Sequence, residues 1–194
     1  MLRICEFARE RGIGLHLDGA RLLIEAVYTG IAPADYAALF DTVYVSLYKY
    51  LNAAAGAVLA GPRTLLEDLY HQRRMFGGGL PHVWPYAAVA LHSLDGFAER
   101  FATAVAASKM LLDAVRDHPR VIVIRPQNAT NVTLLQVTGD SAKDLPRRLL
   151  ARGISIRAAR RVLPNGAEFA LHTNETLLHR RIEETIRGFT EALG

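Results

Sequence analysis

The chain has 194 residues, 51% of them hydrophobic, and a net charge of +4. This is the composition of a soluble globular protein, and the single cysteine, Cys5, excludes an internal disulfide and favours a reducing compartment. No long apolar core marks a secretory signal, and the longest uncharged stretch, residues 75–94, contains three glycines in a row and two prolines, so it is a poor membrane span. We therefore expect a cytoplasmic protein with no membrane partner.

Helical and strand patterns alternate through the first part of the chain. Apolar residues at three-residue spacing predict an opening helix that ends at Gly12, and β-branched or apolar runs predict strands. The predicted elements are a helix over 2–11, a strand over 13–17, a helix or turn over 22–28, a helix over 31–40, strands over 41–47 and 57–60, and a helix over 64–75. This alternation indicates the α/β class.

The second part has a different order of elements. Residues 86–118 are mostly helical in pattern, as one long helix or as two, with a weak point at Gly96. The elements predicted after it are strands over 121–124 and 131–137, a helix over 144–152, strands over 154–157 and 168–172, and a helix over 175–193. This order predicts a smaller α+β unit, so we expect two domains, residues 1–95 and 96–194.

Two charged residues stand at the carboxyl ends of predicted strands, where open α/β sheets place ligands. Asp18 ends the first strand in the string HLDGAR, and a carboxylate there could keep a pyridine nitrogen protonated, which makes the ring an electron sink. Lys49 follows the strand VYVSL, and its aromatic and leucine neighbours predict a desolvated amine with a lowered pKa that could form an imine with an aldehyde. Arg21 could bind a carboxylate or a phenolate oxygen.

Each of these signals is weak when it stands alone. An Asp-Gly pair at a strand end is usually a turn or a helix cap, and a lysine after a strand is usually a surface residue. Arg21 could simply pair with Glu25 across one helical turn. The residues by themselves therefore leave a pyridoxal-phosphate site and an ordinary surface as open alternatives.

The order and spacing of these strings resemble the threonine aldolase and β-eliminating lyase family. The string HLDGARL precedes a β-branched strand, Lys49 lies 31 positions after Asp18, and Gly56 with AVLAG follows. RRMFGGG then leads into a long helix. The resemblance covers essentially the whole chain, but only a little over the C-terminal half of the family's usual chain.

The resemblance implies the C-terminal part of the large domain of a fold-type-I pyridoxal-phosphate enzyme, followed by a small α+β domain. It implies a lyase of amino acid metabolism that cleaves β-hydroxy amino acids or eliminates a β-substituent, with pyridoxal 5'-phosphate as cofactor and no metal. Lys49 matches the Schiff-base lysine, Asp18 the partner of the pyridine nitrogen, and Arg21 the arginine near the cofactor oxygen and substrate carboxylate. Ala20 would pack beneath the ring, and Ser46 could touch the phosphate.

Two positions depart from the family pattern. Leu80 and Pro81 follow the triple glycine where an arginine is usual, and Glu168 stands four residues before His172, where an arginine usually helps to hold the substrate carboxylate. A glutamate there is expected to repel a carboxylate, which puts threonine itself in doubt as the substrate. A related β-eliminating lyase remains open.

Alternatives to an active lyase come from what the chain lacks. No glycine-rich phosphate loop precedes Asp18, so the chain is expected to be truncated at its N-terminus, and a catalytically incompetent fragment or a dimerisation or binding module is the second hypothesis. A weaker alternative is nucleic-acid binding through the basic cluster Arg147–Arg161, although no nucleic-acid partner is predicted. The resemblance implies a homo-oligomer, a dimer or a tetramer.

Overall fold

The computed structural model describes residues 1–125 and 131–194. It divides into two compact units, Met1–Ala98 and Glu99–Gly194. The elements of the first unit are α1 (Leu2–Arg9), β1 (His16–Asp18), α2 (Leu22–Thr29), α3 (Pro33–Ala37), β2 (Thr42–Ser46), β3 (Ala57–Ala60), α4 (Arg63–Leu66), α5 (Leu69–Met75) and α6 (Trp84–Leu94).

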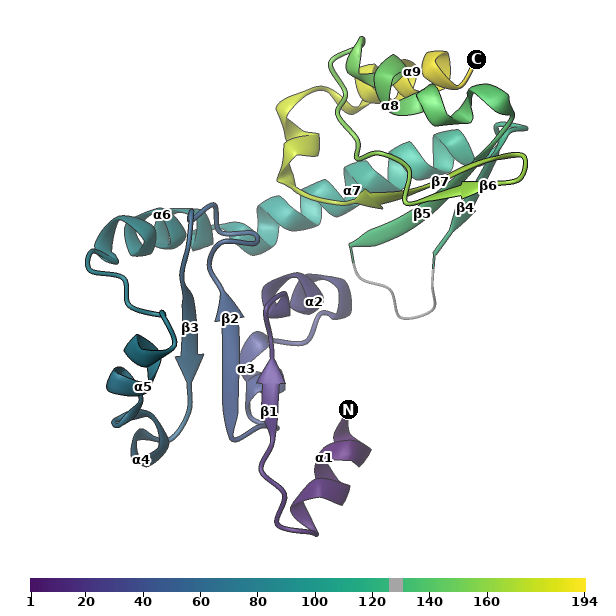
Figure 1. The fold of residues 1–194 in the computed structure, drawn as a ribbon. Helices are drawn as coiled ribbons and strands as arrows, with labels where there is room; N and C mark the ends of the chain where they lie inside the picture. Colours follow the sequence, from purple (N-terminus) through teal and green to yellow (C-terminus); the bar gives the residue numbers. More distant parts are fainter. Residues whose placement is uncertain (126–130) are drawn as a thin grey trace. The chain divides into compact units, whose positions relative to one another are not determined.

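The first unit is built on a three-stranded sheet of order β1-β2-β3 (Figure 1). β1 runs parallel to β2, and β3 runs antiparallel to it. Leu22 of α2 and Tyr36 of α3 form a small core with Val43 of β2. The helices α2 and α3 thus anchor the two parallel strands, whose carboxyl ends lie at the same edge of the sheet.

The first strand begins three residues later than predicted, at His16 instead of residue 13. The backbone N–H of Leu15 donates to Oδ2 of Asp41 at 2.7 Å, and its carbonyl accepts from the backbone N–H groups of Asp41 and Thr42. These bonds hold the preceding residues as a loop. The local apolar run could not reveal them, because Asp41 lies 26 residues further along the chain.

The long helical pattern of residues 86–118 forms two helices. α6 ends at Leu94, and α7 (Phe97–Arg116) begins two residues before the boundary between the units. Gly96 separates them with φ of +63°, a left-handed conformation that favours glycine, so the weak point predicted there is confirmed. The helix predicted over 64–75 is also divided, into α4 and α5.

The second unit is an antiparallel sheet of order β4-β5-β7-β6 with helices packed on one face (Figure 1). Leu135 and Phe169 of the sheet are fully buried against Leu145 and Leu149 and against Phe189. Besides α7 its elements are β4 (Val121–Ile124), β5 (Val132–Thr138), η1 (Asp140–Asp144), α8 (Leu145–Leu150), β6 (Arg161–Leu163), β7 (Gly166–His172), η2 (Glu175–His179) and α9 (Ile182–Leu193).

Two predicted elements of this unit are wrong. Residues 154–157 form no strand, because Ile154 closes the end of α8 by donating its N–H to the carbonyl of Leu149. The strand beside β7 is instead β6, joined to it by the tight turn Pro164-Asn165. The terminal helix starts at Ile182 rather than 175, since the Asn174 side chain caps a separate 3-10 turn by accepting from Thr176 N–H at 2.9 Å.

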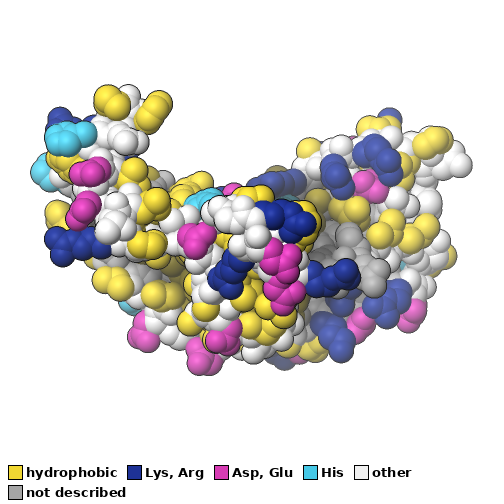
Figure 2. Space-filling model, turned by 90° about the horizontal axis from the view of Figure 1, so that it is seen from below, with side chains coloured by type: hydrophobic (Ala, Val, Ile, Leu, Met, Phe, Trp, Pro, Cys, Tyr) yellow, Lys and Arg dark blue, Asp and Glu magenta, His cyan; other side chains and the backbone are white. Residues whose placement is uncertain are grey.

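Large hydrophobic side chains lie on the surface of the first unit. Met75, Phe76 and Trp84 are between 72% and 87% exposed, and Ile4 is 70% exposed. Figure 2 shows hydrophobic side chains gathered between charged ones on the face that it presents. Exposed apolar surface of this kind is typical of contact with another chain or segment. Within 1–125 and 131–194, no helix combines the length and the apolarity that crossing a bilayer requires.

Candidate active site

The carboxyl ends of β1 and β2 bring the predicted site residues to one edge of the sheet. Asp18, the last residue of β1, pairs in register with Tyr44 of the neighbouring parallel strand. Ser46 is the last residue of β2, and Lys49 lies three residues further on, in the turn that follows. The site therefore results from the parallel pairing of two strands that both end in a loop at this edge, as Figure 1 shows for the strands.

The turn after β1 holds Asp18 and Ala20 in place. Oδ1 of Asp18 accepts a hydrogen bond from the backbone N–H of Ala20 at 3.2 Å. A Cβ at Gly19 would lie 2.9 Å from the carbonyl oxygen of Tyr44, so only glycine allows the turn to approach β2 this closely. Ala20 itself is buried, with 8% of its surface exposed.

Arg21 follows as the residue that precedes α2, and its side chain is exposed. Its guanidinium carbon lies 5.9 Å from the ring centroid of Tyr50, which belongs to the turn of Lys49. The alternative pairing with Glu25 is not among the ion pairs recorded for the described residues. Arg21 is thus directed toward the second strand end rather than along its own helix.

Contacts of the residues before and after Lys49 hold the turn that carries it. Before the lysine, the N–H of Leu47 donates to the carbonyl of Gly56 at 3.0 Å. After it, Leu51 is 3% exposed, and Asn52 adopts the left-handed conformation (φ of 55°) while its side chain donates to Ser93 at 3.2 Å. These contacts fix the backbone from which the Lys49 side chain extends.

The dry surroundings predicted for Lys49 are only partly present. Leu51 is buried, but Lys49 is half-buried and Tyr48 is 47% exposed. The amine lies 5.7 Å from the ring centroid of Tyr48, which is a cation–π distance. Within this unit, the aromatic ring beside Lys49 therefore supplies electrostatic contact more than exclusion of water.

A cluster of hydroxyl groups beside Lys49 was missed by the sequence analysis. The buried Ser46 donates to the hydroxyl of Tyr44 at 3.2 Å. Hydrogen bonding by Tyr44, then by Ser46, and the charge of Lys49 lower the pKa of Tyr48, whereas burial and the carboxylate of Asp18 oppose this shift. The available signal was the alternation of the strand, which directs residues 44 and 46 to one side.

The opposing influences on Tyr48 link the two strand ends electrostatically. Asp18 and Lys49 both act on the same phenol, one from each turn. A narrow cavity between the turns is lined by Ala20, Arg21, Ser46 and Tyr50. The edge therefore gathers an amine, a carboxylate, a guanidinium group and hydroxyls. This set can bind an aldehyde covalently and hold a proton on a ring nitrogen.

The second unit corrects the expectation of a repelling carboxylate at Glu168. This side chain is buried, with its residue 4% exposed, and it accepts a hydrogen bond from Gln136 Nε2 at 2.9 Å. It also forms ion pairs with Arg161 at 3.3 Å and with Arg160 at 3.8 Å. Its negative charge is therefore offset by its own neighbours, and it does not stand free to repel an anion.

The pH dependence of stability provides a test of this cluster. The hydrogen bond from Gln136 and the charges of Arg161 and Arg160 hold the pKa of Glu168 below its ordinary value, although burial acts in the opposite direction. A lowered folded-state pKa contributes stability that is present above the unfolded pKa and is lost as the pH falls through the folded one. We expect a Glu168→Gln variant to unfold at lower urea concentration than wild type at pH 7, with the difference shrinking below about pH 4.5.

The matched control for this experiment is Glu191→Gln. Glu191 pairs with Arg152 at 3.3 Å, but its side chain is 56% exposed, so water screens the pair and the change should have little effect at any pH. A Glu168→Gln variant that follows the wild-type pH profile throughout would contradict the assigned role of this carboxylate.

Comparisons with known proteins show which proteins this chain is similar to. A family model described as beta-eliminating lyase matches residues 1–138. The chain is 32% identical over 151 residues to the low-specificity L-threonine aldolase of Candida albicans, an alignment that covers 78% of this chain and 39% of that protein.

Solved structures extend the likeness to nearly the whole chain. A structure from Exiguobacterium, assigned as an aromatic amino acid beta-eliminating lyase/threonine aldolase, superposes with a TM-score of 0.83 at 26% identity over 98% of this chain and 55% of that one. A structure assigned as an L-allo-threonine aldolase, from Listeria monocytogenes, gives a TM-score of 0.81 at 24% identity and covers the same shares. The predicted α/β class of fold-type-I pyridoxal-phosphate enzymes is confirmed, and the chain spans about half the length of these relatives, 39% to 55%.

Proposed function

This chain belongs to the beta-eliminating lyase family, and we propose that it acts as a pyridoxal-phosphate-dependent lyase on amino acids. The reaction is cleavage of the Cα–Cβ bond of a β-hydroxy amino acid or elimination of a β-substituent. The observation that carries the proposal is the position of Asp18 at the end of β1 and of Lys49 in the turn after β2, the strand that pairs in parallel with β1.

The residues present at this edge fit the cofactor. Lys49 offers the amine that an aldehyde needs, Asp18 offers a carboxylate for a ring N–H, and the buried Ser46 offers a hydroxyl. The small side chain of Ala20, buried between the two turns, suits a flat ring packed against it. When bound, pyridoxal phosphate supplies the electron-withdrawing ring that weakens a bond at the amino acid's α-carbon.

Each side chain has a separate role in this proposal. The amine of Lys49 binds the aldehyde and, once the substrate has displaced it, moves a proton as general base or acid. The carboxylate of Asp18 holds the proton on the ring nitrogen. Ser46, whose single hydroxyl proton is given to Tyr44 in this structure, turns that proton to the phosphate when the cofactor binds, and the guanidinium group of Arg21 binds the substrate carboxylate or the cofactor's phenolate oxygen.

The substrate is proposed only as a class. Leu80 and Pro81 offer no charge to a carboxylate, and Glu168 is committed to Gln136 and the two arginines beside it. Arg21 is therefore the carboxylate anchor of the first unit that we propose. We also propose that the protein is cytoplasmic and works as a homo-oligomer, since the exposed hydrophobic side chains of the first unit need a covering surface.

Covalent mapping among the three lysines tests the proposal. The chain is incubated with pyridoxal phosphate and reduced with borohydride, and the labelled peptides are identified by mass spectrometry. We expect the label on Lys49 in preference to Lys109 and Lys143, although both of these are more exposed and so more open to random reaction. Equal labelling of the three lysines would contradict the proposal, and no label on Lys49 would favour a non-catalytic binding module.

A further inference from the structure

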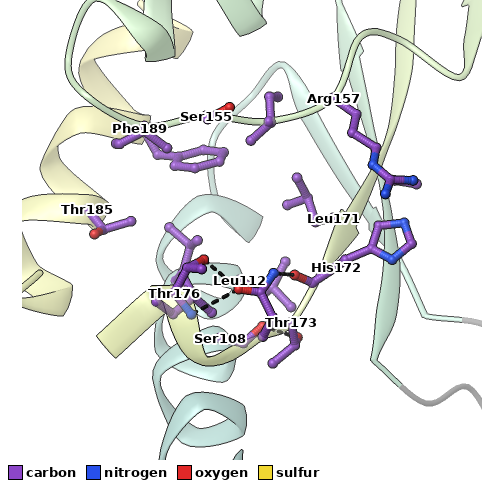
Figure 3. Close-up of a pocket in the computed structure, with 16 residues that line it drawn as sticks. Ser108, Leu112, Ser155, Arg157, Leu171, His172, Thr173, Thr176, Thr185 and Phe189 are labelled. Atoms are coloured by element: carbon purple, nitrogen blue, oxygen red, sulfur yellow. Dashed lines mark hydrogen bonds between the residues drawn. The ribbon is translucent and has the colours of Figure 1, made fainter. Parts of the chain in front are cut away.

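A second cavity is lined entirely by residues of the second unit. It has a volume of about 300 Å³ and is enclosed by α7, residues 154–157, the end of β7, η2 and α9 (Figure 3). This volume is at the lower end of the range for small-molecule sites, which is about 300–1,000 Å³. None of the proposed lyase residues lines it.

The walls of this cavity combine an apolar body with hydroxyl groups. Leu112, Leu171 and Phe189 contribute apolar surface, and hydroxyls come from Ser108 and Thr185, among others (Figure 3). Sites that bind small molecules typically have this composition of mostly apolar walls with a few polar groups.

Hydrogen bonds hold one rim of the cavity in a single arrangement. Thr173 donates its hydroxyl to Ser108 at 2.8 Å, and its backbone N–H donates to the carbonyl of Asn131 at 2.8 Å. Asn174 accepts from the N–H of Thr176 and donates to the carbonyl of His172 at 3.0 Å. The cavity is thus preformed, so that a ligand would not have to order these segments on binding.

The charge of the lining is positive. Arg157 and His172 lie on the same side of the cavity in Figure 3, and no Asp or Glu is among the lining residues. Four other arginines of the basic cluster already have carboxylate partners: Arg147, Arg152, Arg160 and Arg161. Arg157 is in none of the ion pairs recorded within 1–125 and 131–194, so its charge is available to an incoming anion.

We propose that this cavity binds a small organic carboxylate with an aliphatic or aromatic body. The guanidinium group of Arg157 pairs with the carboxylate, and the body lies against Leu112, Leu171 and Phe189. A cationic ligand would meet no counter-charge in the lining, and a purely polar anion would leave the apolar walls without contact. The basic cluster thereby includes one arginine with a ligand-binding role that is independent of the lyase site.

The test measures binding of 4-methylpentanoate to the full chain by titration in ¹⁵N–¹H NMR spectra. We expect saturable shifts in amides of the cavity walls, and weaker binding of the neutral 4-methylpentanamide. Arg157→Gln should weaken carboxylate binding about tenfold to a hundredfold, because a charge-assisted hydrogen bond is lost. Arg157→Lys keeps the positive charge but not the paired N–H donors of the guanidinium group, so its affinity for the carboxylate should fall less than that of Arg157→Gln.

Two controls separate this cavity from other sites. Arg187→Gln removes the same charge from an exposed position of α9 that does not line the cavity, and it should leave the affinity unchanged. Lys49→Ala removes the proposed lyase amine and should also leave it unchanged, so the two proposals fail independently. Shifts confined to residues 1–98, equal binding of the amide, or equal losses in Arg157→Gln and Arg187→Gln would each overturn the assignment.

Discussion

A Lys49→Ala variant is expected to form no visible absorbance band with pyridoxal phosphate and no adduct stable after borohydride reduction. The amine of Lys49 is the group at the strand ends that can condense with an aldehyde, and alanine offers no nucleophile. The same amine is the proposed proton carrier, so its loss should make cleavage of a β-hydroxy amino acid slower than in wild type by a factor of about 10² to 10⁴. Absorbance spectroscopy and a glycine-release assay measure the two effects separately.

Stability should hardly change in this variant. Lys49 is half-buried, and its turn is fixed by Leu47, Leu51 and Asn52 rather than by the lysine side chain. A thermal unfolding midpoint close to that of wild type would therefore show that the loss is chemical. The matched controls are Lys109→Ala and Lys143→Ala, which remove exposed lysines of the second unit and should retain the band. A Lys49→Ala variant with a wild-type band would end the assignment of this residue.

The second large effect concerns the core of the second unit. We expect Phe169→Ala to lower the free energy of unfolding by about 3–5 kcal/mol, the usual range for removing a fully buried phenylalanine. Phe169 is 1% exposed on β7 and contacts a core to which α7, α8 and α9 all contribute. Movement of one helix alone cannot fill the cavity that the missing ring leaves, because the other two helices also pack on this face of the sheet and keep their positions.

Urea unfolding followed by far-UV circular dichroism measures this loss. Tryptophan fluorescence is less suitable, because the single tryptophan, Trp84, belongs to the first unit. A domain is stable by only about 5–15 kcal/mol, so Phe169→Leu provides a milder second variant that should remain folded. Val162→Ala on β6 is the control, because Val162 is 61% exposed and its truncation should cost less than about 0.5 kcal/mol. Equal losses in Phe169→Ala and Val162→Ala would contradict the described core.

Predictions from the sequence succeeded where short-range patterns decide the structure. The alternation of helices and strands indicated the α/β class, and a glycine at position 96 marked the break between two helices. They failed at residues 154–157, where the alternation of Ile154 and Ile156 with polar residues suited a strand as well as a loop packed on the core. Burial satisfies Ile154 and Ile156 in either conformation, so hydrophobicity could not distinguish them.

In the candidate site too, the local sequence pattern indicates some features and only the structure reveals others. Strand ends can be read from local pattern, so Asp18 and Lys49 were predicted at the edge of a sheet, and their assigned roles stay predictions. The bond between Ser46 and Tyr44 required a side-chain geometry that only the structure supplies. The sequence analysis also misjudged Glu168, because the partners that offset its charge come from β5, from β6 and from Arg160 just before β6, up to 32 residues away.

What the sequence by itself determined is the order of elements and the chemical groups that stand at the ends of two strands, because backbone preference and side-chain period act over a few residues. Tertiary structure alone decided which charges are offset and where a cavity remains. Both depend on contacts between segments far apart in the chain. The pairing of Glu168 and the cavity beside Arg157 are the two outcomes that no local pattern contained.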